Sequence, residues 1–176
     1  MASFDPKSFS RNEWGIIGGV LVAFIGLFLH AYKVSIKGAP SSFLGINYSY
    51  SWLGWHFAGL WVPVLILAVP AAIIVAVRAL RSDLIPANIP VGTRLVVAAA
   101  LILALIIEVI RALTYPTTGV SQVSAGATYG TYIICIATAV ATAFAVLDFK
   151  ESGEALPKMP TKPAGTSTPS DTPPSV

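Results

Sequence analysis

The chain has 176 residues, of which 55% are hydrophobic and only 11% are charged, and its formal net charge is +3. Soluble domains carry about 25% charged residues, so this composition argues against a soluble globular protein. The small net charge and the lack of a basic cluster argue against nucleic-acid binding. The single cysteine, Cys135, excludes an intrachain disulfide and any site built from several cysteines.

The apolar residues gather in four segments, each of about the length that a helix needs to cross a bilayer core of about 30 Å. After an N-terminal segment at 1–13, the predicted spans are 14–32, 56–80, 95–114 and 128–147. The first has no small-x-small cleavage site, so we expect it to be retained as a span. The predicted fold is an all-α integral membrane protein, an antiparallel four-helix bundle.

The connecting segments at 33–55 and 115–127 are predicted loops, because glycine, proline and serine interrupt them. The aromatic half at 43–55 is compatible with a segment that lies on the membrane surface, a short strand or a short helix. Pro63 and Pro70 predict a bend in the second span, since proline removes a helix hydrogen bond. The tail at 148–176 is rich in proline, serine and threonine and is predicted to be disordered.

The basic residues predict the orientation in the membrane. Four spans place both termini on one side, which carries eight lysines and arginines against three on the other, and this predicts cytoplasmic termini in the plasma membrane. The eight are Lys7, Arg11, Arg78, Arg81, Arg94, Lys150, Lys158 and Lys162, and the three are Lys33, Lys37 and Arg111.

Two spans carry small residues at a spacing of four, which places them on one helix face. These are Gly15, Gly19 and Ala23 in the first span and Ala137, Ala141 and Ala145 in the fourth. Small residues let helix backbones approach closely in a membrane. The two faces predict close packing, either within this chain or against another membrane protein or a second copy.

Glu108 is the most unusual residue of the third span, which is otherwise apolar apart from Arg111 and the terminal Thr114. A carboxylate at mid-depth costs about 3 kcal/mol, so it needs a partner or a watery cavity. It lies about 20 Å along the span, in the outer third, near the depth of His30, His56 and Arg111. We expect Glu108 to face the bundle and to pair with at least one of these three residues.

Three interpretations of this polar cluster remain open. The favoured one is a structural ion pair of Glu108 with Arg111, helped by a histidine or Tyr115. The second is a proton or ligand site that opens outward, since histidine titrates near neutral pH. The third is a metal site of His30, His56 and Glu108, which the neighbouring arginine opposes. No catalytic motif is present, so we predict no enzymatic activity, no cofactor and no bound metal.

Aromatic residues concentrate at the predicted outer boundary and predict an ordered aromatic cap. Its members are Tyr48, Tyr50, Trp52, Trp55, Trp61 and Tyr115. An ordinary aromatic belt would populate both membrane interfaces. The cap either anchors the chain at the interface or offers ring faces that bind sugar, lipid or peptide groups.

Two sequence resemblances bear on the family. Trp52 with the later Gly59-Leu60-Trp61 is similar to a pattern of claudin-type proteins, but Val62-Pro63-Val64 follows where those proteins carry cysteines, so we reject that family. RNEWGIIGGVLVAFIGLFL, SWLGWHFAGLWVPVL and the Pro/Ser/Thr-rich tail resemble small four-span membrane proteins of actinobacteria, over about residues 10–150. This resemblance implies a bacterial membrane protein and no particular activity.

The predicted function is that of a non-enzymatic accessory or scaffold protein of the cell envelope, which contacts a larger membrane complex through its helices. Its expected partners are membrane lipid and another membrane protein or a second copy, and nucleic acid is not among them. The alternative is a small oligomeric transporter or channel that uses Glu108 with His30 and His56.

Overall fold

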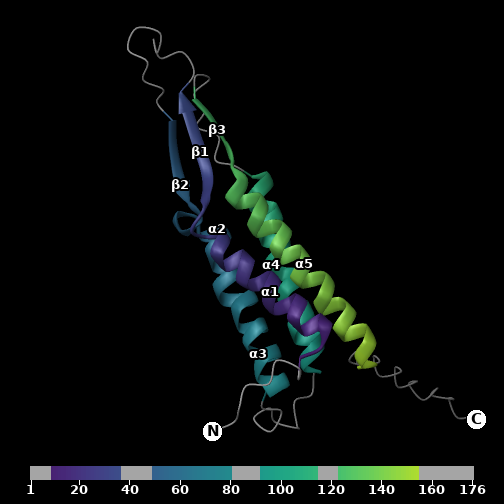
Figure 1. Cartoon of the computed structure of the whole chain (residues 1–176). Helices are drawn as coiled ribbons and strands as arrows, with labels where there is room; N and C mark the ends of the chain where they lie inside the picture. The colour runs from purple at the N-terminus through teal and green to yellow at the C-terminus, as the bar shows by residue number, and fades with distance from the viewer. Residues whose placement is uncertain (1–8, 37–48, 81–91, 115–122, 155–176) are drawn as a thin grey trace, which may run out of the picture.

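The computed structural model describes residues 9–36, 49–80, 92–114 and 123–154, and this part of the chain is mostly helical (Figure 1). The α-helices are α1 (Arg11–Gly26), α2 (Ala58–Val62), α3 (Val69–Leu80), α4 (Thr93–Leu113) and α5 (Tyr129–Ser152). A 3-10 helix, η2 (Gly54–His56), precedes α2, and a π-helical segment, η3 (Pro63–Ala68), joins α2 to α3. The strands are β1 (His30–Ile36), β2 (Ser49–Leu53) and β3 (Val123–Ala127).

Within the described residues, three helical stretches are long and apolar enough to cross a membrane, namely Ala58–Leu80, Thr93–Leu113 and Tyr129–Ser152. The first apolar segment behaves differently from its predicted span at 14–32. Helix α1 has 16 residues, about 24 Å of helix, and ends at Gly26. The next three amides bond three residues back, and the chain then extends into β1, whose pairing on both sides holds His30 and Tyr32 outside the helix.

The predicted bend between Pro63 and Pro70 corresponds to a change of helix type. Residues Pro63–Ala68 form wider π-helical turns, and the amide of Val69 donates to the carbonyl of Val64. Neither proline has an N–H to donate, so the regular pattern of helix hydrogen bonds is interrupted at both. A π segment inside an α-helix accommodates such a break while the helix continues.

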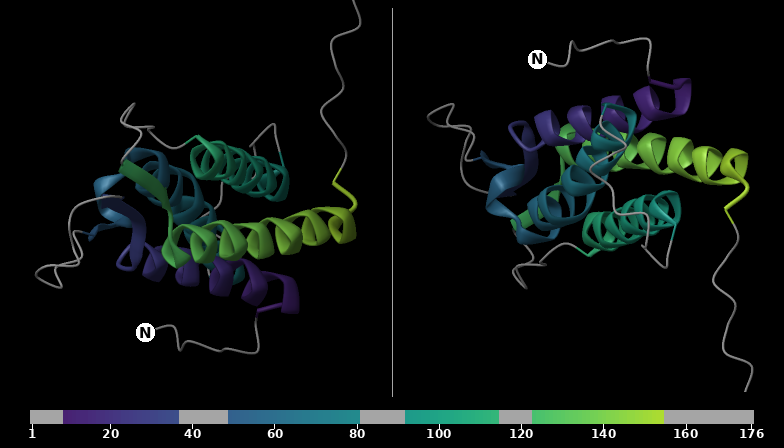
Figure 2. Two further views of the ribbon diagram at one scale, coloured as in Figure 1. Left: turned by 90° about the horizontal axis from the view of Figure 1, so that it is seen from above. Right: turned by 90° about the horizontal axis from the view of Figure 1, so that it is seen from below.

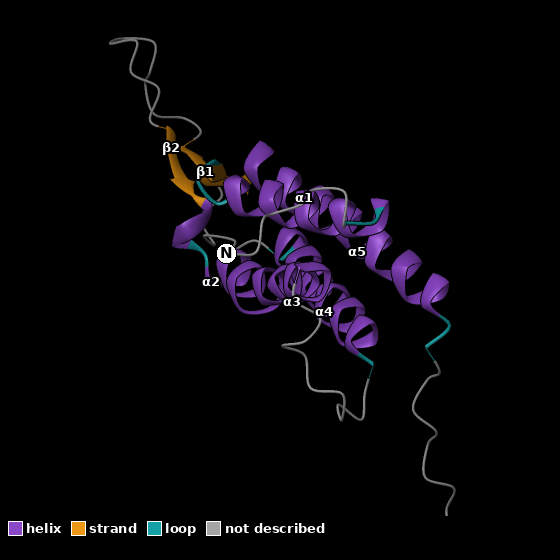
Figure 3. Ribbon diagram, turned by 60° about the horizontal axis from the view of Figure 1, so that its bottom comes forward, coloured by secondary structure: helices purple, strands orange, loops and turns teal. Residues whose placement is uncertain are grey.

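A three-stranded antiparallel sheet lies beyond one end of the helices, so the all-α prediction is wrong for the described parts of the two connections (Figure 3). The strand order is β2-β1-β3, and Tyr32 in the central strand lies opposite Trp52 on one side and Ala127 on the other. The register shifts between His30 and Tyr32, which marks a bulge where β1 leaves α1. Each connection therefore contributes at least one strand to a shared sheet.

Hydrogen bonds fix this sheet to the helix ends. The Thr131 hydroxyl of α5 donates to the carbonyl of Ala31 at 2.6 Å, and the Thr128 amide donates to the same oxygen at 3.0 Å. On the other side, the Gly54 amide donates to the carbonyl of Leu29 at 3.1 Å. Strand β1 is thus held both by its neighbouring strands and by the start of α5.

Helix α5 lies between α1 and α4 and packs against both (Figure 2), while η3 and α3 also pack against α1 and α4. The predicted small-residue faces meet here. A Cβ atom built on Gly19 would lie 2.9 Å from the Ala137 carbonyl oxygen and 2.9 Å from the Ala141 Cβ. Ala23 and Ala145 are buried in the apolar clusters beside this contact. Both faces are therefore used for packing within the chain.

Helix α5 is longer than its predicted span. It continues through Asp148 to Ser152, and Gly153 ends it with a φ of 67°, a left-handed conformation that favours glycine. The first residues of the predicted disordered tail are therefore helical. The part of that tail at 155–176, and the predicted loop residues 37–48 and 115–122, lie outside the described residues.

Candidate functional site

Glu108 lies on the buried face of α4. Val97, Leu101, Ala104 and Glu108 follow one another at spacings of three and four, which places them on one side of the helix, and all four are buried. The first three form an apolar seam, and Glu108 follows them on the same face, about 7.5 Å from the helix end at Leu113. Its side chain is fully enclosed, with 0% of its surface exposed.

One hydroxyl group of α5 contacts the Glu108 carboxyl group. Thr138 Oγ1 donates to Glu108 Oε1 at 3.2 Å, whereas Oε2 has no hydrogen-bond partner among the described residues. Thr142, one turn further along α5, makes the ordinary helical contact, donating to the carbonyl of Thr138 at 2.8 Å. Thr138 therefore differs from its neighbour in bonding across to α4.

Arg111 packs against α2. Its guanidinium carbon lies 6.0 Å from the centre of the Phe57 ring, a cation–π contact. A Cβ atom on Gly59 would lie 2.7 Å from Arg111 Cγ, so the absence of a side chain at Gly59 makes room for the arginine. Within the described chain no ion pair joins Arg111 to Glu108, and the prediction that they pair is wrong.

Neither histidine forms a hydrogen bond or an ion pair with Glu108 in the described part of the chain. His30 is exposed on β1, where its Nδ1 is 3.2 Å from the Tyr129 hydroxyl, and His56 is exposed at the end of η2. His30 was expected near Glu108 because the first helix was predicted to run past it, whereas α1 ends at Gly26. His56 was expected at the same depth because it opens the second predicted span. The described residues contain no group of three metal-ligating side chains. His30, His56 and Glu108 therefore do not form a three-ligand metal site among the described residues.

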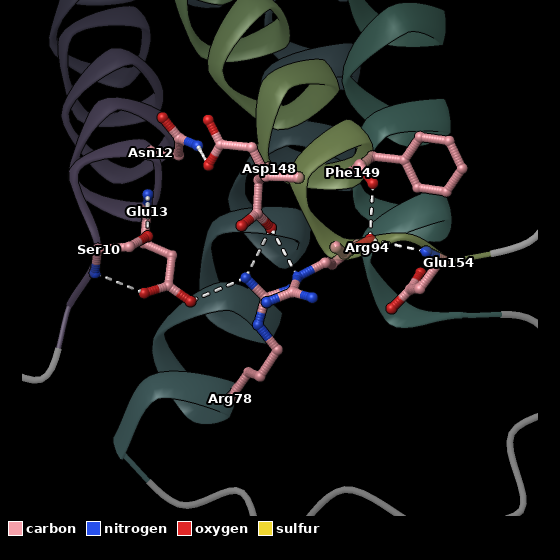
Figure 4. A network of polar contacts seen from close by, with 10 residues as sticks. Ser10, Asn12, Glu13, Arg78, Arg94, Asp148, Phe149 and Glu154 are labelled. Atoms are coloured by element: carbon pink, nitrogen blue, oxygen red, sulfur yellow. Dashed lines mark hydrogen bonds and ion pairs between the residues drawn. The ribbon is translucent and has the colours of Figure 1, made fainter.

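A second polar site lies at the opposite end of the helices from the sheet. We name Glu13, Arg78, Arg94 and Asp148 the ion-pair cluster, and each comes from a different helix (Figure 4). Arg78 Nη2 lies 2.8 Å from Glu13 Oε1 and 2.8 Å from Asp148 Oδ2. Arg94 Nε lies 3.2 Å from the same Asp148 oxygen. Two positive and two negative charges thus join α1, α3, α4 and α5.

The capping box at the start of α1 orients Glu13, which precedes the apolar part of that helix, for its ion pair with Arg78. Ser10 and Glu13 form a capping box at the start of α1, in which the Glu13 amide donates to Ser10 Oγ at 3.2 Å and the Ser10 amide donates to Glu13 Oε2 at 2.8 Å. Burial by itself raises the pKa of Glu13, but the contacts with Arg78 and Ser10 outweigh it and hold that pKa below its ordinary value. Glu13 is therefore an ionised, ion-paired carboxylate at neutral pH.

None of the four residues of the ion-pair cluster is among the predicted site residues, although the sequence contains a pattern that indicates the cluster. From the sequence, Arg78 and Arg94 serve only to predict the orientation in the membrane. Asp148 is predicted only as the first residue of the tail. Yet each of the four apolar segments has a charged residue at its end on the same predicted side, two acidic and two basic. Opposite charges at one level of a helix bundle are the feature that predicts such a network.

The predicted aromatic cap divides into separate groups. We name Tyr50, Trp52, Tyr32 and Phe57 the aromatic row, since consecutive rings are 5.7, 6.1 and 5.1 Å apart. It runs from Tyr50, which is 73% exposed, to the Phe57 ring beneath Arg111. Tyr32 and Phe57 are not among the residues predicted for the cap.

The other cap residues are not part of the aromatic row. Trp55 packs edge-on against Phe28 and Phe24, with ring centres 5.3 and 6.1 Å away. Trp61 packs against the apolar cluster at the sheet end. Tyr48 and Tyr115 lie outside the described residues.

No protein-family model matches this chain, and comparisons with curated proteins and with solved structures give no match. What the chain does must therefore follow from its own geometry. That geometry offers an uncompensated buried carboxyl group, an ion-pair cluster between helices and an aromatic row with one exposed end.

Proposed function

We propose that this chain is a non-enzymatic accessory protein of the cell envelope, which spans the membrane and binds another membrane protein through its sheet. The three long apolar helices support the membrane location. We assign α1 to the membrane as well, because it packs along α5 and exposes large apolar side chains, among them Leu21, Val22 and Ile25.

We propose that the sheet faces the outside and the ion-pair cluster faces the cytoplasm. Arg11 and Lys150 are exposed at the ion-pair end of α1 and α5, beside the arginines of the cluster. An excess of basic residues is typical of the cytoplasmic side of membrane proteins. The cluster then lies at the cytoplasmic membrane interface.

The observation that carries the proposed function is the aromatic row. The small-residue helix faces that first suggested a partner are occupied within the chain by each other. Another surface must therefore serve a partner, and the row presents Tyr50 at its exposed end, supported from behind by Trp52. Tyrosine and tryptophan held by neighbouring rings are frequent anchors of protein interfaces, because they bury a large area at little cost in conformational entropy.

Affinity isolation in mild detergent tests this proposal. The tagged protein should retain a partner in a fixed ratio, and Tyr50→Ser should lower the amount of that partner about tenfold or more, as buried aromatic anchors do. Tyr132→Ser is the matched control, since Tyr132 is also exposed but belongs to α5 and not to the aromatic row. Isolation of the chain with no stoichiometric partner, or equal loss in both variants, would contradict the proposal.

A further inference from the structure

Glu108 is a buried carboxyl group that forms no ion pair with any of the described residues. Its surface is 0% exposed, its Oε1 accepts one hydrogen bond from Thr138, and its Oε2 has no partner among the described residues. An ionised carboxylate placed in apolar surroundings without a cation is so costly that it takes up a proton instead. We propose that Glu108 is a proton-binding site in the interface of α4 and α5, and that it is a neutral carboxylic acid at neutral pH.

The groups on the packed elements support this assignment. On α5, the facing side chains are the hydroxyl of Thr138 and, within electrostatic reach, the thiol of Cys135, neither of which supplies a positive charge. On α4 itself, Arg111 is one turn away and packs against Phe57. From the α2 side, Gly59 brings no side chain, and His56, which precedes α2, is exposed.

The ion-pair cluster provides a comparison within the same molecule. Asp148 is buried at the other end of α5, but two arginines lie within 3.2 Å of its Oδ2. A carboxylate with such partners is stable in its charged form. Among the described residues, Glu13 and Asp148 at one end of the helices are therefore paired with arginines, whereas Glu108 towards the other end forms no ion pair.

The unpartnered oxygen of Glu108 determines what this site can do. When the acid is neutral, Thr138 donates to Oε1 and the proton resides on Oε2, where the described residues place no acceptor. A water molecule or another hydrogen-bond acceptor that enters between the helices would find a donor there. Loss of the proton requires such an entry, because it would leave a bare charge between α4 and α5.

Infrared spectroscopy of the full chain in detergent tests the proposal directly. A neutral carboxylic acid has a carbonyl stretching band that a carboxylate lacks, and this band moves when the exchangeable proton is replaced by deuterium. The difference spectrum of wild type minus Glu108→Gln should contain this band at neutral pH. Its absence, together with the bands of an ionised carboxylate, would overturn the proposal.

Two threonine variants show whether the band arises at this interface. Thr138→Val removes the only hydrogen bond to Glu108 from the described residues and should shift the band to higher frequency. Thr142→Val, one turn along the same helix, should leave it unmoved, because Thr142 bonds to the Thr138 carbonyl and not to Glu108. A band that both variants move equally, or that neither moves, would assign the proton to another carboxyl group and contradict the proposal.

A measurement on the wild-type sequence covers the case in which Glu108→Gln does not fold. Glutamate labelled with carbon-13 in its carboxyl group should move the band to lower frequency, while aspartate labelled in the same way should not. A band that moves only with labelled aspartate would overturn the proposal. Folding of Glu108→Gln is itself expected, since glutamine keeps the shape of the neutral acid and its carbonyl can still accept from Thr138.

Discussion

Two kinds of buried carboxyl group occur among the described residues, and their partners differ in chemistry. Glu13 and Asp148 share Arg78, whose guanidinium offers several donors in a fixed plane and so contacts both carboxylates. Glu108 has a hydroxyl partner and no cation. Removal of the shared arginine from the ion-pair cluster should therefore lower the stability of the protein strongly, because Glu13 and Asp148 depend on a cation and Glu108 does not.

Arg78→Met should destabilise the protein by about 3 kcal/mol, because it leaves two neighbouring carboxylates buried without their shared cation. Thermal unfolding of the purified chain in detergent measures this as a fall in the midpoint temperature.

Arg94→Met is the matched control for Arg78→Met. Arg94 contacts only Asp148 within the cluster and is 33% exposed, so its loss should cost less than about 1 kcal/mol. Equal destabilisation by the two variants, or no effect of Arg78→Met, would show that Arg78 does not hold the cluster together.

The prominence of Glu108 was predictable from the sequence, and so was its burial, because it is the one carboxyl group within an apolar segment. Its partner was not predictable. Depth along a span can be counted from residue numbers, but which side chains meet depends on helix rotation and on where each helix ends. His30 was misplaced for the second reason, because α1 ends before it at Gly26.

Among the elements, the contact of α1 with α5 is the closest, and it depends on individual glycines. Gly19 has no room for a side chain, since an added Cβ atom would lie 2.9 Å from the Ala137 carbonyl oxygen and 3.0 Å from the Ala141 nitrogen. These are backbone atoms, which cannot move without shifting α5. Gly18, its neighbour in sequence, has open space around the same position.

Gly19→Ala should therefore destabilise the chain by about 1–3 kcal/mol through overpacking. Gly18→Ala should be neutral or stabilising by about 0.5–1 kcal/mol, because alanine restricts the unfolded chain and favours the helix. Unfolding of both variants under the same detergent conditions gives the comparison. A larger loss for Gly18→Ala than for Gly19→Ala would contradict this packing of α1 on α5.

The sequence predicted the apolar helices better than it predicted the sheet. Long apolar segments predict the helices, and such segments are local features of the chain. Strand β3 is made of Val123–Ala127, small residues without a strong alternating pattern, and its partner β1 lies about ninety residues earlier. Pairing with this distant strand stabilises the extended conformation, and a local window of sequence does not contain that partner.

At the scale of the whole molecule, polar contacts at both ends enclose an apolar middle. The sheet joins the two connections at one end, and the ion-pair cluster joins four helices at the other. Between them lie apolar side chains packed in two clusters, with Glu108 near the sheet end. This arrangement suits a membrane, because the polar contacts fall where the chain leaves the apolar layer.

Cysteine labelling tests whether the sheet and the ion-pair cluster lie on opposite sides of the membrane. In a Cys135→Ala background, Tyr50→Cys places a thiol on the sheet and Lys150→Cys places one in the last turn of α5, both at exposed positions. A membrane-impermeant maleimide should label Tyr50→Cys in intact cells. It should label Lys150→Cys only after the membrane is permeabilised, because α5 separates the two sites by the thickness of the apolar layer. The reverse pattern would invert the proposed orientation, and labelling of both thiols under the same condition would contradict a membrane-crossing α5.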